Sequence, residues 1–190
     1  LKEGGYLCAV LPCGNRDSFE ERITRLVWGG KEDSIDARER FFYEDAGHIR
    51  RMKSSELIEL FARNNVRLYK EFYAYQFWGA IEWISKSGHA VINKIFSNNR
   101  GVGLLAKMEL LFFRIVFNIL AVPMKLYTAD LLECIKSNRN MAKKVLLASL
   151  IPFRIIVIPF GKIIDLFSFL EWHFFKMRKH GSAQYLIFRK

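Results

Sequence analysis

The sequence predicts an α/β protein in which a few strands combine with a long helical segment. Three segments, at about residues 5–11, 66–77 and 182–189, are typical of strands because they are short, apolar or aromatic, and bounded by turn-forming residues. Residues 78–180 instead contain long apolar runs of helical length. The strands therefore come from both ends of the chain and the helices from its middle.

The first predicted strand is an unbroken apolar run at residues 6–11, between a glycine pair and a proline. Such a run favours a strand buried on both faces of a parallel sheet, with Cys8 in the core. Asp17 and Glu20 then have the spacing of a helix cap, and the apolar positions that follow predict a helix over residues 18–28.

Residues 31–53 are densely charged and predict a long loop. Ser54 or Ser55 is expected to cap the next helix, whose inward-facing residues are Leu57, Ile58 and Phe61. Residues 66–77 are rich in β-branched and aromatic side chains that roughly alternate, which predicts a strand. Its aromatic rings, with Trp78, are expected in the core of the sheet and hairpin, and a platform for stacking sugars is the alternative.

Charge is distributed unevenly along the chain. Residues 1–80 carry 13 basic and 13 acidic side chains, whereas residues 81–190 carry 17 basic and 6 acidic ones, which accounts for the net charge of +11. The second part also contains the most apolar stretches. This combination favours a membrane surface over a nucleic acid as partner, because nucleic-acid surfaces are basic and polar.

Composition excludes two classes of protein. A chain that is 51% hydrophobic can bury enough apolar surface to offset its ordering entropy, which excludes intrinsic disorder. Three scattered cysteines, Cys8, Cys13 and Cys134, are too few for a disulfide framework and indicate reducing surroundings. No spacing of histidine, cysteine and carboxylate residues predicts a metal site.

Three stretches together resemble one enzyme family. The sequence Leu-Lys-Glu-Gly-Gly at residues 1–5, followed by the apolar strand, resembles the turn and fifth strand of class I S-adenosylmethionine-dependent methyltransferases, although Glu3 stands where that family usually has proline. Gly-His-Ile-Arg-Arg at residues 47–51 resembles the stretch before the family's last helix. The terminal strand, which ends in Phe-Arg-Lys at residues 188–190, resembles its antiparallel seventh strand.

The resemblance covers residues 1–77 and 181–190, about the carboxyl half of the family's catalytic domain. It implies an incomplete Rossmann-like methyltransferase sheet, with residues 78–180 as an insertion before the last strand. The family's glycine-rich cofactor loop and ribose-binding acid lie on earlier strands, so we expect no residue of this segment to bind S-adenosylmethionine. Because the chain starts at Leu1, inside the resembling domain, we expect it to be a segment of a larger enzyme.

Insertion energies argue against a membrane crossing by the helical segment. Residues 104–122 contain three charged side chains, each costing roughly 2.5–3.5 kcal/mol near a helix centre, against roughly 0.3–0.6 kcal/mol returned by each apolar residue. Both flanking strands belong to one sheet, which leaves zero or two crossings, and the basic connection at residues 123–144 favours zero. We therefore expect interfacial or shallow re-entrant helices, and a cytoplasmic protein that is peripheral at the membrane.

The basic residues of this segment are expected to lie near anionic lipid headgroups. These residues are Arg114, Lys125, Lys143, Lys144, Arg154, Lys162, Lys176, Arg178 and Lys179. A helical subdomain core or a dimer interface is the alternative for the same helices, and the oligomeric state is left open.

Candidate site residues follow from the resemblance, because methyl transfer needs proximity and sometimes a general base. His48 is the candidate base, since the pKa class of histidine suits neutral pH. Asn15 follows the first strand, at the edge where open α/β sheets bind ligands. Arg50 and Arg51 are candidates to hold a phosphate or carboxylate of the acceptor. Local hydrogen bonds and solvated ion pairs are the alternative roles of these four residues.

Together these features predict methyl transfer from S-adenosylmethionine to an amphiphilic acceptor, such as a lipid-linked or saccharide compound, at a membrane surface. The alternative is a non-catalytic membrane-associated or scaffolding protein with a partial α/β fold. A nucleic-acid-binding module is the third interpretation, and we do not expect a nucleic-acid partner.

Overall fold

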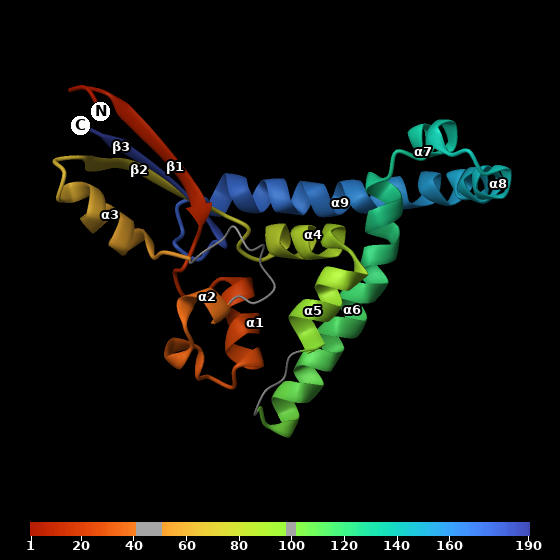
Figure 1. Ribbon diagram of the computed structural model, residues 1–190, viewed down its shortest axis with the longest axis horizontal. Helices are drawn as coiled ribbons and strands as arrows, with labels where there is room; N and C mark the ends of the chain where they lie inside the picture. Colours follow the sequence, from red (N-terminus) through yellow and green to blue (C-terminus); the bar gives the residue numbers. More distant parts are fainter. Residues whose placement is uncertain (41–50, 98–101) are drawn as a thin grey trace.

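The computed structural model describes residues 1–40, 51–97 and 102–190. Within these ranges a small sheet lies at one end of the molecule and long helices extend away from it (Figure 1), so the predicted combination of few strands with many helices is confirmed. The strands are β1 (Tyr6–Pro12), β2 (Arg67–Ala74) and β3 (Ala183–Arg189). The helices are α1 (Phe19–Val27), a 3₁₀ turn (Glu32–Ser34), α2 (Ala37–Arg40), α3 (Ser54–Ala62), α4 (Trp78–Ser87), α5 (His89–Ser97), α6 (Leu104–Thr128), α7 (Leu131–Ser137), α8 (Met141–Ser149) and α9 (Ile151–Phe175).

The three strands form an antiparallel sheet with the order β1-β3-β2. β3 lies between the other two strands and runs antiparallel to both, so that Cys8 of β1 is opposite Ile187 and Phe72 of β2 is opposite Tyr185. β1 and β2 consequently run in the same direction without pairing with each other. The strand from the end of the sequence is thus the central strand of the sheet.

β1 is an edge strand of this sheet, which corrects the prediction of a strand buried on both faces of a parallel sheet. Leu7 and Ala9 pack on the face that α3 covers, whereas Tyr6, Cys8 and Val10 on the opposite face are exposed. An unbroken apolar run does not distinguish the two situations, because burial depends on what covers the second face.

The covered face of the sheet packs against α3. Phe61 of α3 lies 4.3 Å from Phe188 of β3, measured between ring centroids, and Leu57 and Leu186 are buried in the same cluster. The inward-facing positions that the sequence predicts for α3, including Ile58, are therefore confirmed.

Three element ends differ from the predictions. Lys53, and not Ser54 or Ser55, stands at the cap position of α3, because the helix already begins at Ser54. Ser18 caps α1, because its hydroxyl accepts a hydrogen bond from the backbone N–H of Glu21 at 3.1 Å. Asp17, expected as the cap together with Glu20, has a φ of +73° instead of the extended conformation of a cap residue. β2 ends earlier than predicted because Tyr75 has a φ of +58°, which turns the chain out of the strand.

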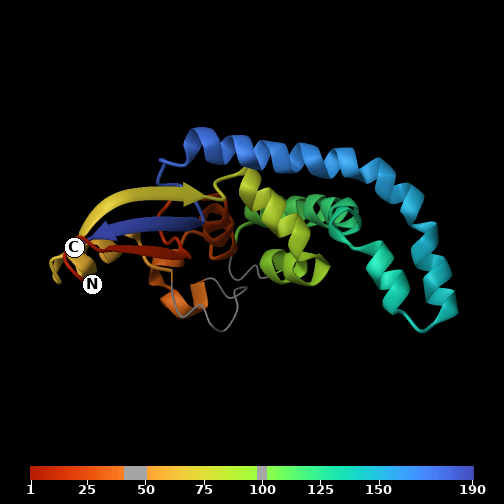
Figure 2. The ribbon, with the colours of Figure 1, turned by 90° about the horizontal axis from the view of Figure 1, so that it is seen from above.

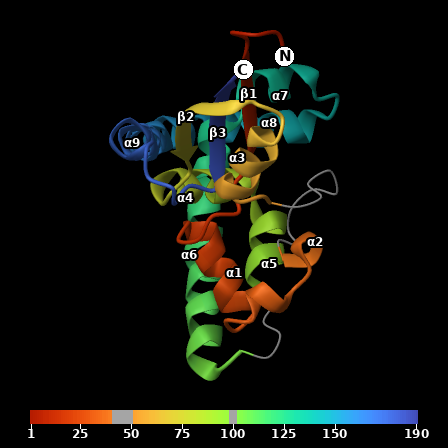
Figure 3. The same cartoon turned by 90° about the vertical axis from the view of Figure 1, so that its left-hand side faces the viewer.

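A second hydrophobic core joins α1 to the helices that lie between β2 and β3 in sequence. α1, α5 and α6 lie side by side beneath the sheet (Figure 3). Phe19 of α1 contacts Phe113 and Phe117 of α6, with ring centroids 5.7 and 6.1 Å apart. Ile23 and Ile84 are buried in the same cluster. The helix after β1 therefore shares its core with the helical segment.

α9 brings the chain back to the sheet from the far end of the molecule, where α8 lies (Figure 2). Of its 25 residues, only Gly161, Ile164 and Glu171 are buried. By length and apolar composition, no single described helix could cross a membrane. α8 and α9 satisfy these criteria only as a pair, which is bent by 46° between them.

The carboxylate of Glu171 holds the end of α9 against the start of α4. Its Oε1 accepts hydrogen bonds from the N–H groups of Gln76 (3.0 Å) and Gly79 (3.2 Å). Its Oε2 accepts from Phe77 (2.9 Å) and Trp78 (2.6 Å). α4 has no acidic residue in its own first turn and no capping side chain. Glu171 therefore satisfies the open N–H groups of this helix and complements the positive end of its dipole.

Gln76 makes the reciprocal connection to α9. Its Nε2 donates a hydrogen bond to the carbonyl of Phe175 at 2.6 Å, and the N–H of Tyr73 donates to the carbonyl of Lys176, also at 2.6 Å. The carbonyl of Gln76 in turn accepts a bond from the N–H of Phe19 at 3.2 Å. α1, β2, α4 and α9 therefore meet at one junction.

We expect Glu171→Gln to lower the free energy of unfolding by roughly 1–3 kcal/mol, because the new amide group turns one acceptor into a donor that faces backbone N–H groups. Urea unfolding of the purified protein measures this loss. The control is Glu59→Gln, since Glu59 is exposed and forms a surface ion pair with Arg63, and it should change stability by less than about 0.5 kcal/mol. Equal stability of the two variants would contradict the structural role of Glu171.

Candidate functional site

Asn15 connects the turn after β1 to the start of α3. Its Oδ1 accepts a hydrogen bond from the N–H of Ser54 at 3.0 Å, and its Nδ2 donates to the Ser54 hydroxyl at 3.1 Å. The residue lies after β1, as predicted, and both ends of its amide are used within the protein. These bonds give Asn15 a role in joining β1 to α3.

Arg51 forms a buried ion pair, not a solvated one. Its Nη2 lies 2.5 Å from Oε2 of Glu20, and each side chain is only 6% exposed. Breaking such a pair is costly, because it leaves a buried charge without its counter-charge. His48 and Arg50, the other two candidates from the same stretch of sequence, lie outside the described residues.

Cys13 lies at the end of β1 and is buried. Burial raises the pKa of its thiol to about 11, against the smaller lowering effects of a hydrogen bond from the N–H of Asn15 and of the charge on Arg51. The thiol is therefore protonated at neutral pH and is not an activated nucleophile.

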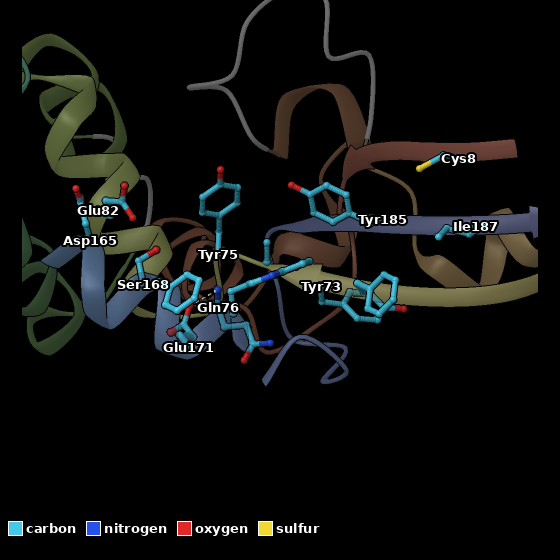
Figure 4. A pocket seen from close by; sticks show the side chains of 14 residues that line it. Cys8, Tyr73, Tyr75, Gln76, Glu82, Asp165, Ser168, Glu171, Tyr185 and Ile187 are labelled. Carbon is cyan, nitrogen blue, oxygen red and sulfur yellow. Dashed lines mark hydrogen bonds between the residues drawn. The ribbon is translucent and has the colours of Figure 1, made fainter. Parts of the chain in front are cut away.

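A groove of about 520 Å³ lies between the open face of the sheet and α9 (Figure 4). Phe72, Tyr185 and Ile187 line it from the sheet, and Trp172 lines it from α9. Trp172 contacts Tyr185 edge to face, with ring centroids 5.5 Å apart. The groove thus offers aromatic surfaces next to the end of β2.

Tyr75 lies at the rim of this groove in a strained backbone conformation. A φ of +58° is unusual for a bulky residue and costs of the order of 1–3 kcal/mol. Gly79 makes the arrangement possible, because a side-chain carbon there would lie 3.0 Å from the ring of Tyr75. Figure 4 shows Tyr75 and Tyr185 as neighbours, and burial together with the nearby Tyr75 raises the pKa of the Tyr185 hydroxyl.

A polar cluster closes the end of the groove next to α4. Lys86 lies 2.5 Å from Glu82 and 3.0 Å from Asp165, whose second oxygen accepts a hydrogen bond from the Tyr127 hydroxyl at 2.5 Å. Partial burial alone would raise the pKa of Asp165, but the hydrogen bonds from Tyr127 and Lys86 outweigh it and lower this pKa. The carboxylate therefore stays ionised at neutral pH.

The charges around the groove restrict what it can bind. Three carboxylates line it, those of Glu82, Asp165 and Glu171, whereas no basic side chain is among its described lining residues. Lys86 and the start of α4 already engage these carboxylates. The groove is thus suited to an uncharged group with apolar or ring-shaped parts, and not to a phosphate.

The basic residues predicted to contact lipid differ in their surroundings. Lys179 pairs with Glu71 at 2.8 Å, and the guanidinium of Arg178 lies 4.3 Å from the ring centroid of Phe175. The Nε of Arg114 donates a hydrogen bond to Oδ1 of Asn93 on α5 at 2.8 Å. Exposed residues are Lys125, Lys143, Lys162, Arg178 and Lys179, and half-buried ones are Arg114, Lys144, Arg154 and Lys176.

The long helices expose many large apolar side chains. On α6 these are Leu104, Leu105, Met108, Leu111, Phe112, Ile115, Ile119 and Val122. On α8 and α9 they include Met141, Val145, Leu146, Phe153, Ile155, Ile156, Ile163, Leu166, Phe169 and Phe174. Exposed apolar surface on this scale is typical of a surface that contacts a membrane or another protein.

The glycines at the strand ends do not form a cradle for S-adenosylmethionine. A side-chain carbon at Gly14 would lie 2.8 Å from the carbonyl oxygen of Arg51, and one at Gly181 would overlap the backbone of Ala74. Protein backbone therefore already fills the space beside both residues. Among the described residues, no group of side chains has the arrangement of a metal site.

Comparison with protein-family models, with curated proteins and with solved structures found no match for this chain.

Sequence reasoning did not single out Glu171, Gln76 or Asp165. Each makes its decisive contacts with residues far away in the sequence, such as the N–H of Phe77 for Glu171. One signal was present: Glu171 is one of only six acidic residues after position 80.

We expect Cys13 to resist alkylation by iodoacetamide in the folded protein while Cys8 and Cys134, which are exposed, react. With a pKa of about 11, only about one thousandth of the Cys13 thiol is ionised at about pH 8, and burial blocks access as well. Mass spectrometry of the peptides after a timed reaction measures the three sites separately. In urea all three should react, and rapid labelling of Cys13 in the native protein would show this environment to be wrong.

Proposed function

We propose that this chain is the carboxyl-terminal part of an S-adenosylmethionine-dependent methyltransferase that acts at a membrane surface on a lipid-linked or saccharide acceptor. The enzymatic half of the proposal rests on the sheet, and the membrane half rests on the exposed surface of the helices. In this proposal the protein is cytoplasmic and peripheral at the membrane.

The observation that carries the enzymatic half is the direction of β3. The family resemblance implies a last strand that runs antiparallel and pairs with the strand before the insertion, and β3 has both properties. β1 and β2 run in the same direction and are linked through α1 and α3, as in a βαβ unit. In a meander, consecutive strands pair with each other, so β2 would pair with β1 and run in the opposite direction to it.

The cofactor itself would be bound by residues outside this sequence. When bound, S-adenosylmethionine supplies an activated methyl group, and no step of the transfer is assigned to the described residues. Their contribution in this proposal is to hold the acceptor. The aromatic groove beside Tyr75 and Trp172 lies next to the end of β2 and suits an uncharged acceptor group, such as a sugar ring or part of an isoprenoid chain.

The membrane half rests on the exposed apolar side chains of α6, α8 and α9 together with the basic residues among them. An interfacial helix buries its apolar face at the acyl boundary and places its basic residues among anionic headgroups. Lys143 and Lys162, on α8 and α9, are exposed beside exposed apolar neighbours. This arrangement supports contact with an anionic membrane surface.

A non-catalytic membrane-associated protein is the second candidate. The observation that favours it is that Asn15 and Arg51, two of the proposed acceptor-binding residues, are engaged by Ser54 and Glu20 within the protein. Such a protein would use the same helices on the membrane and would have no cofactor-binding part.

We expect the full-length protein to bind S-adenosylmethionine and residues 1–190 alone not to bind it. Equilibrium dialysis with labelled cofactor measures both, and methyl transfer to a crude lipid extract then tests the acceptor class. A full-length protein that neither binds the cofactor nor contains a glycine-rich turn after a strand would leave only the non-catalytic candidate.

We expect the protein to float with vesicles of phosphatidylcholine and phosphatidylglycerol, and Ile156→Glu to weaken this binding by about tenfold or more, because one aliphatic side chain leaving lipid costs about 1.5–3 kcal/mol. Ile156 is 72% exposed on α9, so the substitution spares the core.

The matched control is Leu60→Glu, which makes the same kind of change at an exposed position of α3, beside the sheet. It should leave binding to the vesicles unchanged. Equal effects of the two substitutions would show that α9 is not the membrane-contacting element.

A further inference from the structure

A second groove, of about 550 Å³, lies on α6 and against α5, away from the sheet. Four aliphatic side chains line it: Leu111, Ile115, Ile119 and Val122. All four are exposed and belong to the apolar surface of α6. The rest of the lining is polar and comes from Asn93, Arg114 and Asn118.

The polar side chains form a connected network that holds Arg114 in place. The Nε of Arg114 donates a hydrogen bond to Oδ1 of Asn93 at 2.8 Å. Nδ2 of Asn118 donates to the same oxygen at 3.3 Å and to the carbonyl of Arg114 at 2.8 Å. Nδ1 of His89 lies 2.6 Å from Oδ1 of Asn118. The guanidinium is thus anchored through its Nε in the wall of an otherwise aliphatic groove.

The terminal nitrogens of Arg114 are the part of this network that can take a ligand. In the described part of the chain, no carboxylate pairs with Arg114, and Arg114 is the only charged residue that lines the groove. The acidic residue nearest to it on α6 is Glu109, which pairs with Arg22 of α1 at 3.0 Å. A guanidinium presents a planar fork of donors that matches the oxygens of a phosphate.

We propose that this groove binds the phosphate of an anionic lipid headgroup, with Arg114 on the phosphate and the four aliphatic residues against the acyl chains. Asn93 and Asn118 act as positioning residues for the guanidinium. The site rests on the membrane half of the proposed function and deepens it, because it names the lipid chemistry that α6 recognises. The aliphatic lining favours lipid over nucleic acid, since no aromatic ring is among the described lining residues for base stacking.

The test compares binding of the full chain to phosphatidylcholine vesicles that contain either phosphatidic acid or phosphatidylglycerol at the same mole fraction. We expect tighter binding to phosphatidic acid, whose phosphate is exposed. Arg114→Gln should weaken that binding by about tenfold or more, since hydrogen bonds to charged groups contribute about 1.5–3 kcal/mol.

Arg139→Gln is the matched control, because Arg139 is exposed between α7 and α8, outside the groove. It removes the same charge and should weaken binding by no more than about fivefold, the effect of one basic residue near an anionic surface. Equal losses for the two variants would overturn the proposal and leave only general electrostatic attraction.

Asn93→Ala separates recognition from net charge, because it removes the anchor of Arg114 without changing the charge of the protein. We expect it to abolish the preference for phosphatidic acid, and urea unfolding checks that the variant is folded. A preserved preference in a folded Asn93→Ala variant would contradict the positioning role.

Two further arms identify the source of the phosphate. Displacement of wild-type protein from the vesicles by millimolar inorganic phosphate would show a site for free phosphate instead of lipid. Binding of single-stranded RNA is measured as well. If Arg114→Gln weakens RNA binding and leaves vesicle binding unchanged, the proposal is overturned.

Flotation of the two variants distinguishes failure of this lipid site from failure of the proposed function. If Ile156→Glu prevents flotation while Arg114→Gln does not change it, the groove is not a lipid site and the membrane proposal stands. If the wild-type protein binds no vesicles at all, the membrane half of the proposed function fails as well.

Discussion

The fold depends on one buried carboxylate at the junction of α9 and α4. A carboxylate out of water is destabilising unless hydrogen bonds replace its hydration, and Glu171 receives four of them from consecutive backbone N–H groups. Gln76 makes the return connection to the last turn of α9. Because these bonds fix the end of β2 and the end of α9 together, β3 can re-enter the sheet in register after more than a hundred intervening residues. The strained conformation of Tyr75 lies within the same junction and is held by it.

Two grooves of opposite chemistry lie on the protein, one that includes Glu171 and Gln76 of this junction and one on α6. The groove beside the sheet is aromatic and lined by carboxylates, while the groove on α6 is aliphatic and contains one anchored arginine. The protein as a whole has a net charge of +11, so an acid-lined groove beside the sheet is not an average property of its surface. A basic, apolar helical surface and a groove suited to an uncharged group are consistent with the proposed amphiphilic acceptor. Under the proposed function, the helices would contact the charged headgroup region and the sheet would contact the uncharged group.

Short-range patterns predicted the elements well and their surroundings poorly. The runs at residues 6–11 and 182–189 are strands, as expected, and Leu57, Ile58 and Phe61 face the core. The prediction that Cys8 is buried was wrong, because an apolar run does not reveal which face of a sheet is covered. Asn15 lies at the strand end that its position predicted, yet only the structure shows that Ser54 occupies its amide group. The ion pair of Arg51 with Glu20 was hidden for the same reason: its partner is distant in sequence.

By itself the sequence determined the three strands and the helical character of the segment between the last two. It also determined the separation of a charge-neutral first part from a basic, apolar second part, and the resemblance on which the enzymatic proposal rests. These follow from periodicity and composition, which act between neighbours along the chain. Tertiary structure alone decided the central place of β3, the capping of α4 by Glu171 and the anchoring of Arg114 by Asn93. Such contacts bring together residues from separate elements, and their hydrogen bonds form only after packing has excluded water. No pattern within a single segment of sequence contains that information.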